Sequence, residues 1–227
     1  MRLSAIVPAA GASRRMGRGV DKLYRSLQGK PLLIHSLLSL EKAPWVKGIV
    51  LVVARRRLRL AKRLVGRYRL RKIRGIYPGG RTRAESVALG MRQIDPRADY
   101  VLVHDGARPL LRSGLLNRVM KAARKNGAAI PALPVGPTIK EVNPTGFVVK
   151  TLPRRRLWEV QTPQIFRRAH LARALERSWV RREEATDCAS LVERSGHRVK
   201  VVLGDPMNLK VTTPMDFIVA EALLKKS

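Results

Sequence analysis

The stretch Ser4-Ala5-Ile6-Val7-Pro8-Ala9-Ala10-Gly11-Ala12-Ser13-Arg14-Arg15-Met16 decides the fold. A short apolar run, predicted to be a buried strand, breaks into a loop of residues with very small side chains, after which two arginines and then Lys22 follow. Small residues let the backbone approach a ligand closely, and cations suit a polyphosphate. The loop also lies where the first βα turn of a nucleotide-binding α/β fold would be. A tight turn before a basic helix is the other interpretation.

Length and composition favour a single α/β domain over residues 1–227. Hydrophobic residues make up 45% of the chain, which is typical of a globular protein, and aromatic residues only 4%, so the core must be mostly aliphatic. The single cysteine, Cys188, excludes an internal disulfide and indicates a reducing compartment, where a buried structural thiol is expected. With no apolar run near the roughly 18 residues of a membrane helix, we expect a cytoplasmic protein with no membrane partner.

The charge is strongly positive, with 47 Lys and Arg against 16 Asp and Glu and a net charge of +31. Such a balance attracts nucleic acids, anionic surfaces and phosphorylated metabolites. Many of the cations lie between Arg55 and Arg74. This segment lacks the interleaved aromatic residues of a base-stacking surface and matches no groove-reading motif, so we expect a solvated helix face and no specific nucleic-acid partner.

Apolar runs with strand character alternate with helical patterns along almost the whole chain. This order predicts a three-layer αβα sandwich around a mostly parallel, Rossmann-like sheet. The expected strands are 5–7, 46–53, 73–77, 100–104, 127–135 and 199–203, and the expected helices are 31–40, a basic helix after 53, 82–94, 113–125 with Ser113 as N-cap, 166–178, 185–194 and 214–224. Residues 136–156 depart from the pattern, and 148–152 are expected to form one limb of a projecting hairpin.

Three candidate motifs follow predicted strands and should meet at their carboxyl ends, where such sheets bind ligands: residues 8–16, 79–86 and 105–108. The free N–H groups and hydroxyls of 79–86 suit a base or a phosphate, although ordinary capping by Thr82 explains them equally well. Asp105 suits a metal or a ribose hydroxyl, or else forms an Asx turn. Lys210 precedes a helix that Thr212 or Thr213 could cap. The four histidines show no metal-ligand spacing.

Taken together, five ordered motifs resemble the 2-C-methyl-D-erythritol 4-phosphate cytidylyltransferases of the non-mevalonate isoprenoid pathway. The resemblance runs from about Leu3 to Leu224 and is carried by Pro8-Ala9-Ala10-Gly11 through Arg15-Met16, Asp105-Gly106-Ala107-Arg108-Pro109, Gln161-Thr162-Pro163-Gln164, Thr186-Asp187 and Leu209-Lys210-Val211-Thr212. It implies transfer of a cytidylyl group from CTP to methylerythritol phosphate, with Mg²⁺ as cofactor and pyrophosphate as the leaving group.

The resemblance also implies residue roles. Arg15 and Lys22 would be catalytic. The residues expected to bind CTP are Ala9, Ala10, Gly11, Arg15, Lys22, Gly80, Arg83, Ser86 and Ala107. Those expected to bind the polyol phosphate are Asp105, Arg108, Thr138, Arg154, Thr162, Thr186 and Lys210. Asp105 is also a candidate metal ligand, with Mg²⁺ held mainly by the CTP phosphates.

In this family an arm, here residues 136–156, reaches across a homodimer, so Thr138, Arg154 and Thr162 would serve the neighbouring subunit's substrate.

The chemistry of the implied reaction agrees with the absence of a general base from the sequence motifs. A phosphate monoester has a second pKa of about 6 and is largely ionised at neutral pH. Positioning and fixed cations are then what the reaction needs.

The chain departs from the family pattern at a few positions, and two other functions remain open. Asp21 stands before Lys22 where the family usually has proline, which would weaken the field of that cation. Pro137, Pro153 and Cys188 stand where acidic residues are usual. The alternatives are a cytidylyltransferase for another polyol phosphate, and a nucleic-acid-binding protein built on the same scaffold.

Overall fold

The computed structural model describes residues 1–11, 21–181 and 185–225, with side-chain surroundings described for all of these except 179–181. Residues 12–20, which include Arg15, lie outside the described part. Twelve strands and seven α-helices are assigned within it, together with short 3-10 turns. No helix in these ranges is long and apolar enough to cross a membrane.

An eight-stranded sheet forms the centre of the molecule, in the order β10-β7-β11-β6-β1-β4-β5, with β12 paired to β7. The strands β1, β4, β5, β6 and β12 pair in parallel, whereas β10 and β11 run antiparallel to their neighbours. Their bounds are β1 Leu3–Ala9, β4 Val46–Val53, β5 Ile73–Pro78, β6 Tyr100–Val103, β7 Ala128–Pro134, β10 Trp158–Val160, β11 Gln164–Arg167 and β12 Lys200–Leu203. The expected mostly parallel sheet is confirmed.

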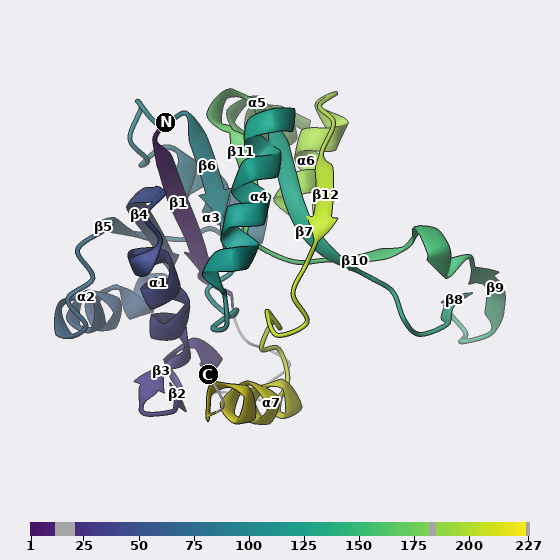
Figure 1. Ribbon diagram of the computed structural model, residues 1–227, viewed down its shortest axis with the longest axis horizontal. Helices are drawn as coiled ribbons and strands as arrows, with labels where there is room; N and C mark the ends of the chain where they lie inside the picture. The colour runs from purple at the N-terminus through teal and green to yellow at the C-terminus, as the bar shows by residue number, and fades with distance from the viewer. Residues whose placement is uncertain (12–20, 182–184, 226–227) are drawn as a thin grey trace.

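Helices cover both faces of this sheet, which makes the three layers. The bounds are α1 Leu32–Lys42, α2 Leu58–Arg67, α3 Arg83–Met91, α4 Ser113–Asn126, α5 Arg168–Arg181, α6 Cys188–Arg194 and α7 Pro214–Lys225. Figure 1 shows α1 and α4 in front of the sheet and α5 and α6 behind it. Along β1, Ala5 and Val7 pack into the core on the α1 and α4 side, and Ile6 packs into the core on the α3 side. Because side chains alternate along a strand, β1 is buried on both faces.

The 136–156 segment leaves the body of the protein as the sequence predicts. Strands β8 (Ile139–Val142) and β9 (Val148–Leu152) pair as an antiparallel hairpin, and a 3-10 turn over Arg154–Arg156 leads back to the sheet. Figure 1 shows this hairpin far to the side of the eight-stranded sheet. Its contacts with the rest of the chain are therefore few, and its side chains are mostly exposed.

Several expected element boundaries are wrong. The helix expected to begin at Phe166 begins at Arg168, because Phe166 belongs to β11, which inserts between β6 and β7 and was missed. The helix expected from 185 begins at Cys188 and is capped by Asp187, whose carboxylate accepts from Ser190 N at 3.0 Å. Ser113 is not an N-cap, since it is the first helical residue and follows Arg112.

Gly90 generates a prediction because it lets α3 approach the sheet. A Cβ at Gly90 would lie 2.6 Å from Ile6 Cγ2 and 3.1 Å from Val52 Cγ2, whereas one at Gly66 in α2 meets nothing within 4 Å. Both positions are helical, so alanine brings the same gain in helix propensity of about 1 kcal/mol. We expect Gly66→Ala to stabilise the protein and Gly90→Ala to destabilise it by about 1–3 kcal/mol through overpacking. Urea unfolding measures both, and equal stabilisation by the two changes would contradict the packing described here.

Candidate active site

Two pockets adjoin at the carboxyl ends of the central strands. Pocket 1, with a volume of about 530 Å³, collects residues from all the motifs that follow β1, β5 and β6. Pocket 2, of about 780 Å³, lies between the end of β6, the β10–β11 connection and the start of α6. Four residues line both pockets, namely Arg83, Asp105, Lys210 and Thr212. The arrangement therefore offers neighbouring sites for two ligands that share one wall, as a group-transfer reaction requires.

The turn between β5 and α3 forms one side of pocket 1. Thr82 caps α3 by accepting from Glu85 N, and Glu85 Oε2 accepts in return from Arg81 N at 2.6 Å and from Thr82 N. Ser86 Oγ accepts from Gly80 N at 3.2 Å. A helix N-terminus carries a partial positive charge that favours an anion nearby. The capping expected of Thr82 is thus present and coexists with a position on the pocket wall.

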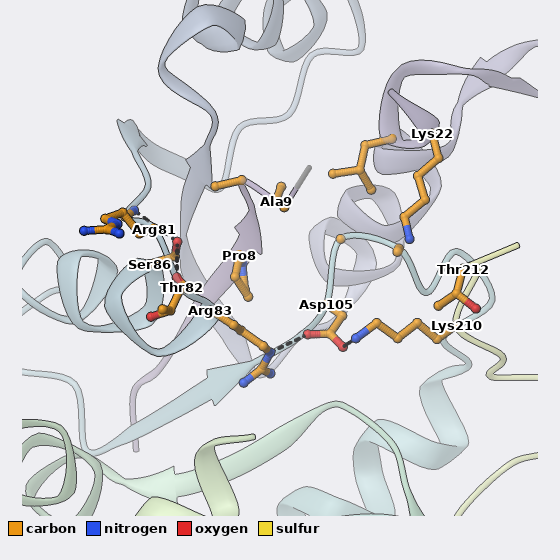
Figure 2. A pocket seen from close by; sticks show the side chains of 16 residues that line it. Pro8, Ala9, Lys22, Arg81, Thr82, Arg83, Ser86, Asp105, Lys210 and Thr212 are labelled. Carbon is orange, nitrogen blue, oxygen red and sulfur yellow. Dashed lines mark hydrogen bonds and ion pairs between the residues drawn. The ribbon is translucent and has the colours of Figure 1, made fainter. Parts of the chain in front are cut away.

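Asp105 follows β6, lines both pockets and forms ion pairs with two cations. Its Oδ1 accepts from Arg83 Nε at 3.0 Å, and its Oδ2 lies 2.8 Å from Lys210 Nζ. Figure 2 shows the two cations reaching this carboxylate from opposite sides. Burial opposes ionisation of Asp105, but the charges of Arg83 and Lys210 outweigh it and hold the pKa of the carboxyl well below its usual range. Asp105 is therefore ionised throughout the physiological pH range.

Cys188 completes the surroundings of Arg83. The thiol is fully buried, and Arg83 Nη1 lies 3.3 Å from its sulfur. Burial raises the pKa of the Cys188 thiol, so the group is neutral at pH 7 and Asp105 supplies the charge that balances Arg83. The prediction of a buried structural cysteine is confirmed.

The neighbourhood of Lys22 differs from the expectation for Asp21. Lys22 begins a short 3-10 turn, Lys22–Tyr24, and lines pocket 1; Figure 2 shows its side chain on the wall opposite Arg83. Asp21 does not direct its charge at Lys22 alone, because its carboxylate accepts from Arg57 Nε at 2.8 Å. The guanidinium of Arg57 thus offsets the carboxylate that was expected to weaken the field of Lys22.

The structure brings most of the predicted site residues together. Pocket 1 contains the predicted CTP-binding residues of the described chain: Ala9, Ala10, Gly11, Lys22, Gly80, Arg83, Ser86 and Ala107. Pocket 2 contains most of the predicted polyol-phosphate residues: Asp105, Arg108, Thr162, Thr186 and Lys210. Arg15 falls outside the described residues.

Two of the predicted side chains in pocket 2 are buried and bonded within their own chain. Thr162, expected to serve a neighbouring subunit, lines pocket 2 of its own chain and is only 4% exposed. Arg108 is also buried, and its terminal nitrogens donate to backbone carbonyls, Nη1 to Asn208 O at 2.6 Å and Nη2 to Val160 O at 3.4 Å. Arg108 therefore fastens the loops around pocket 2. Thr138 and Arg154 lie at the arm, are exposed and line neither pocket.

Sequence reasoning gave no role to several residues that shape pocket 2. Gln164, on β11, donates from Nε2 to Asp187 Oδ2 at 2.7 Å and accepts from Cys188 N at 3.1 Å, which fastens the start of α6. Asn208 donates to Thr162 O at 2.7 Å. Gln164 belongs to the motif Gln161-Thr162-Pro163-Gln164, so the sequence already marked it as a candidate site residue. Its contacts with the start of α6 could not be predicted, because Gln164 lies on β11, which the sequence did not reveal.

The resemblance implies a magnesium ion. The residues of this site fit such an ion only if the phosphates of a bound substrate supply most of its ligands. Both carboxylate oxygens of Asp105 face cations, and the described residues hold no group of three or more His, Cys, Asp or Glu side chains placed to bind a metal. Magnesium commonly binds through substrate phosphates with few protein ligands. The cations of pocket 1 suit such a phosphate-bound ion, and the expectation of Asp105 as a metal ligand does not fit its ion pairs.

Fold and site together define a class of protein: a nucleotidyltransferase, in which small-residue and basic loops at the carboxyl ends of a mostly parallel sheet face a second ligand pocket. The family model of 2-C-methyl-D-erythritol 4-phosphate cytidylyltransferase matches residues 3–226. This chain therefore belongs to that family.

Individual relatives agree with this assignment. The enzyme of that name from Syntrophus aciditrophicus is 44% identical over 223 residues, covering 98% of this chain and 95% of the relative. One from Dehalococcoides mccartyi is 43% identical, covering 99% of this chain and 97% of the relative. Among solved structures, the 4-diphosphocytidyl-2C-methyl-D-erythritol synthase from Anaerococcus prevotii has a TM-score of 0.87 at 31% identity, covering 99% of this chain and 96% of that one.

Gly79 generates a prediction about pocket 1. A Cβ at this position would lie 2.4 Å from Ala10 Cβ and 2.9 Å from Ser86 Oγ, two atoms of the pocket wall. We expect Gly79→Ala to push these walls apart and to weaken CTP binding about tenfold, measured by calorimetric titration. Gly114→Ala, whose added Cβ meets only Arg118 Nη1 at 3.9 Å, is the matched control and should bind CTP normally. Unchanged CTP affinity in Gly79→Ala would remove this turn from the nucleotide site.

Proposed function

We propose that this protein transfers the cytidylyl group of CTP to 2-C-methyl-D-erythritol 4-phosphate and releases pyrophosphate, the reaction for which its family is named. The observation that carries the proposal is the pair of pockets joined by Asp105, with a cation on each side of the carboxylate. CTP occupies pocket 1 and the polyol phosphate occupies pocket 2. The alternatives of another polyol phosphate and of a nucleic-acid-binding protein are not favoured, since the relatives compared carry the methylerythritol phosphate name.

The reaction joins two anions that repel each other, and the charged residues of the site reduce this repulsion. A phosphate oxygen of the polyol phosphate attacks the α-phosphorus of CTP, and the bond from that phosphorus to the bridging oxygen of pyrophosphate breaks. The attacking phosphate is already ionised near pH 7, so no side chain has to remove a proton. Lys22 and Arg15 stabilise the charge that builds on the transferring phosphorus and on the leaving pyrophosphate. When bound with CTP, Mg²⁺ neutralises part of the triphosphate charge.

Different residues bind each of the two substrates in its own pocket. The backbone of Ala9, Ala10 and Gly11 approaches the triphosphate, while Gly80, Arg83, Ser86 and Ala107 lie around the base and the ribose. On the other side, Lys210 binds the polyol phosphate, and Asp105 and Thr186 face its hydroxyl groups. The support for this division is the position of each residue in the pockets.

We also propose that the protein is a homodimer, in which the arm of residues 136–156 completes the partner's pocket 2. Apolar side chains on the arm have no partner surface within the described chain, since Phe147 is 73% exposed and Val148 and Val149 are each 58% exposed. Such exposed apolar groups mark an association surface. Thr138 and Arg154, which reach neither pocket of their own chain, would then contact the partner's substrate. A cytoplasmic location agrees with the free thiol of Cys188 and with a substrate such as CTP.

The role of Lys22 is tested by Lys22→Ala. We expect kcat to fall about 100-fold or more, the scale of one lost transition-state donor, with the same loss for Arg15→Ala. Pyrophosphate release with CTP and methylerythritol phosphate measures the rate. Lys62→Ala, an exposed lysine of α2 that lines neither pocket, is the control and should keep the full rate. Near-wild-type turnover in the folded Lys22→Ala protein would exclude this lysine from the mechanism.

The cross-subunit role of the arm is tested by Arg154→Ala. We expect a raised KM for methylerythritol phosphate with little change in the KM for CTP, while Arg155→Ala, in the same exposed turn, serves as control. Mixing Arg154→Ala with Lys22→Ala subunits gives the sharper result, because a mixed dimer holds one site free of both changes. Exchange should then restore roughly a quarter of wild-type activity. No recovery in exchanged dimers would place Arg154 at its own subunit's site.

A further inference from the structure

Thr162 and His104 are the starting point, because they form a buried polar contact beside pocket 2 that the sequence did not predict. Thr162 precedes β11 and His104 follows β6, and the antiparallel pairing of these strands brings the two side chains together. His104 is fully buried and Thr162 is 4% exposed. Thr162 Oγ1 lies 3.0 Å from His104 Nδ1, and it accepts from Asp105 N at 3.1 Å. The ring nitrogen on the other side, His104 Nε2, lies 3.2 Å from Arg108 O.

The donor and acceptor at each of these contacts follow from the chemistry of the groups. A carbonyl oxygen only accepts, so His104 Nε2 must carry a proton and donate to Arg108 O. Burial lowers the pKa of His104 to about 4, so the ring is neutral at pH 7 and Nδ1 is unprotonated. Nδ1 therefore accepts from the Thr162 hydroxyl. The single proton of that hydroxyl is committed to His104, and one of its lone pairs to Asp105 N.

This chain of hydrogen bonds spans the loop that carries the charged centre of the site. It fixes the loop at its first residue, through Asp105 N, and at its last, through Arg108 O. Between them, Ser36 Oγ donates to Gly106 O at 3.0 Å and Val211 N donates to Ala107 O at 2.9 Å. The Asp105 carboxylate, which pairs with Arg83 and Lys210, thus belongs to a loop in which each residue from 105 to 108 forms a backbone hydrogen bond with another part of the chain or with His104.

We infer that Thr162 and His104 are positioning residues of this reaction, which fix the 105–108 loop and hence the Asp105 carboxylate, and that Thr162 does not donate to the substrate. The geometry commits the hydroxyl proton and one lone pair of Thr162 to partners within its own chain. The expected effect on the kinetics rests on the proposed function. The hydrogen bonds between Thr162, His104 and Asp105 are a property of the protein without substrate and do not depend on that function.

The test compares Thr162→Val, which keeps the shape and removes the hydroxyl, with Thr162→Ser, which keeps the hydroxyl. Removing the hydroxyl leaves Asp105 N and His104 Nδ1 buried without partners. We expect Thr162→Val to raise the KM for methylerythritol phosphate about tenfold or more and to lower kcat, with Thr162→Ser close to wild type. In the protein without ligands, nitrogen NMR should show His104 as the Nε2-protonated tautomer, and the His104 ring and Asp105 amide signals should move in Thr162→Val only.

Each other result overturns the inference. Weakened substrate binding with unmoved His104 and Asp105 signals would mean that Thr162 contacts the substrate directly. Moved signals with normal kinetics would mean that the pair matters for structure alone. If Thr162→Val does not fold, the tautomer of wild-type His104 still decides, since a proton on Nδ1 excludes the arrangement. Absence of turnover with methylerythritol phosphate in the wild type would instead overturn the proposed function and leave the NMR comparison valid.

Discussion

The ion pairs of Asp105 with Arg83 and Lys210 are the interaction on which the site depends. They draw together a cation from the start of α3 and one from the segment before α7, which are far apart in the sequence. Without the carboxylate, two positive charges would face each other in a partly buried position, which costs free energy. Arg83, Asp105 and Lys210 also line both pockets, so the same contact lies at the boundary between the two pockets.

This arrangement answers the main physical difficulty of the proposed reaction, which is repulsion between two phosphorylated reactants. Cations fixed by the fold reduce that repulsion without reorganising during the reaction, and this is where electrostatic catalysis gains most. The net charge of +31 adds long-range attraction for both substrates, but screening by salt limits it beyond about 10 Å. Position, more than total charge, separates Lys22 from the exposed cations of α2. Asp21, which was expected to weaken Lys22, is itself paired with Arg57.

Local patterns predicted most of the fold, and non-local contacts account for what they missed. The run of β4 is so apolar that its bounds, Val46–Val53, follow from the sequence. Strand β11 escaped prediction because Gln164 and Arg167 flank only two apolar residues, and its pairing with β6 and β7 is set by distant segments. The motifs contain most of the predicted site residues that line the two pockets, but the predicted residues Thr138 and Arg154 line neither. The motifs did not predict that Arg108 donates to Asn208 O and Val160 O, or that Thr162 faces His104, because these contacts join segments that are 46 or more residues apart in the sequence.

The most direct measurement is a crystal structure of the protein with CTP, Mg²⁺ and methylerythritol phosphate under conditions that prevent turnover. We predict the triphosphate in pocket 1 with Lys22 Nζ against its oxygens, the polyol phosphate in pocket 2 with Lys210 at its phosphate, and the reacting atoms beside the 105–108 loop. Nucleotide phosphates bound away from Lys22, or both ligands on one side of Asp105, would contradict the account.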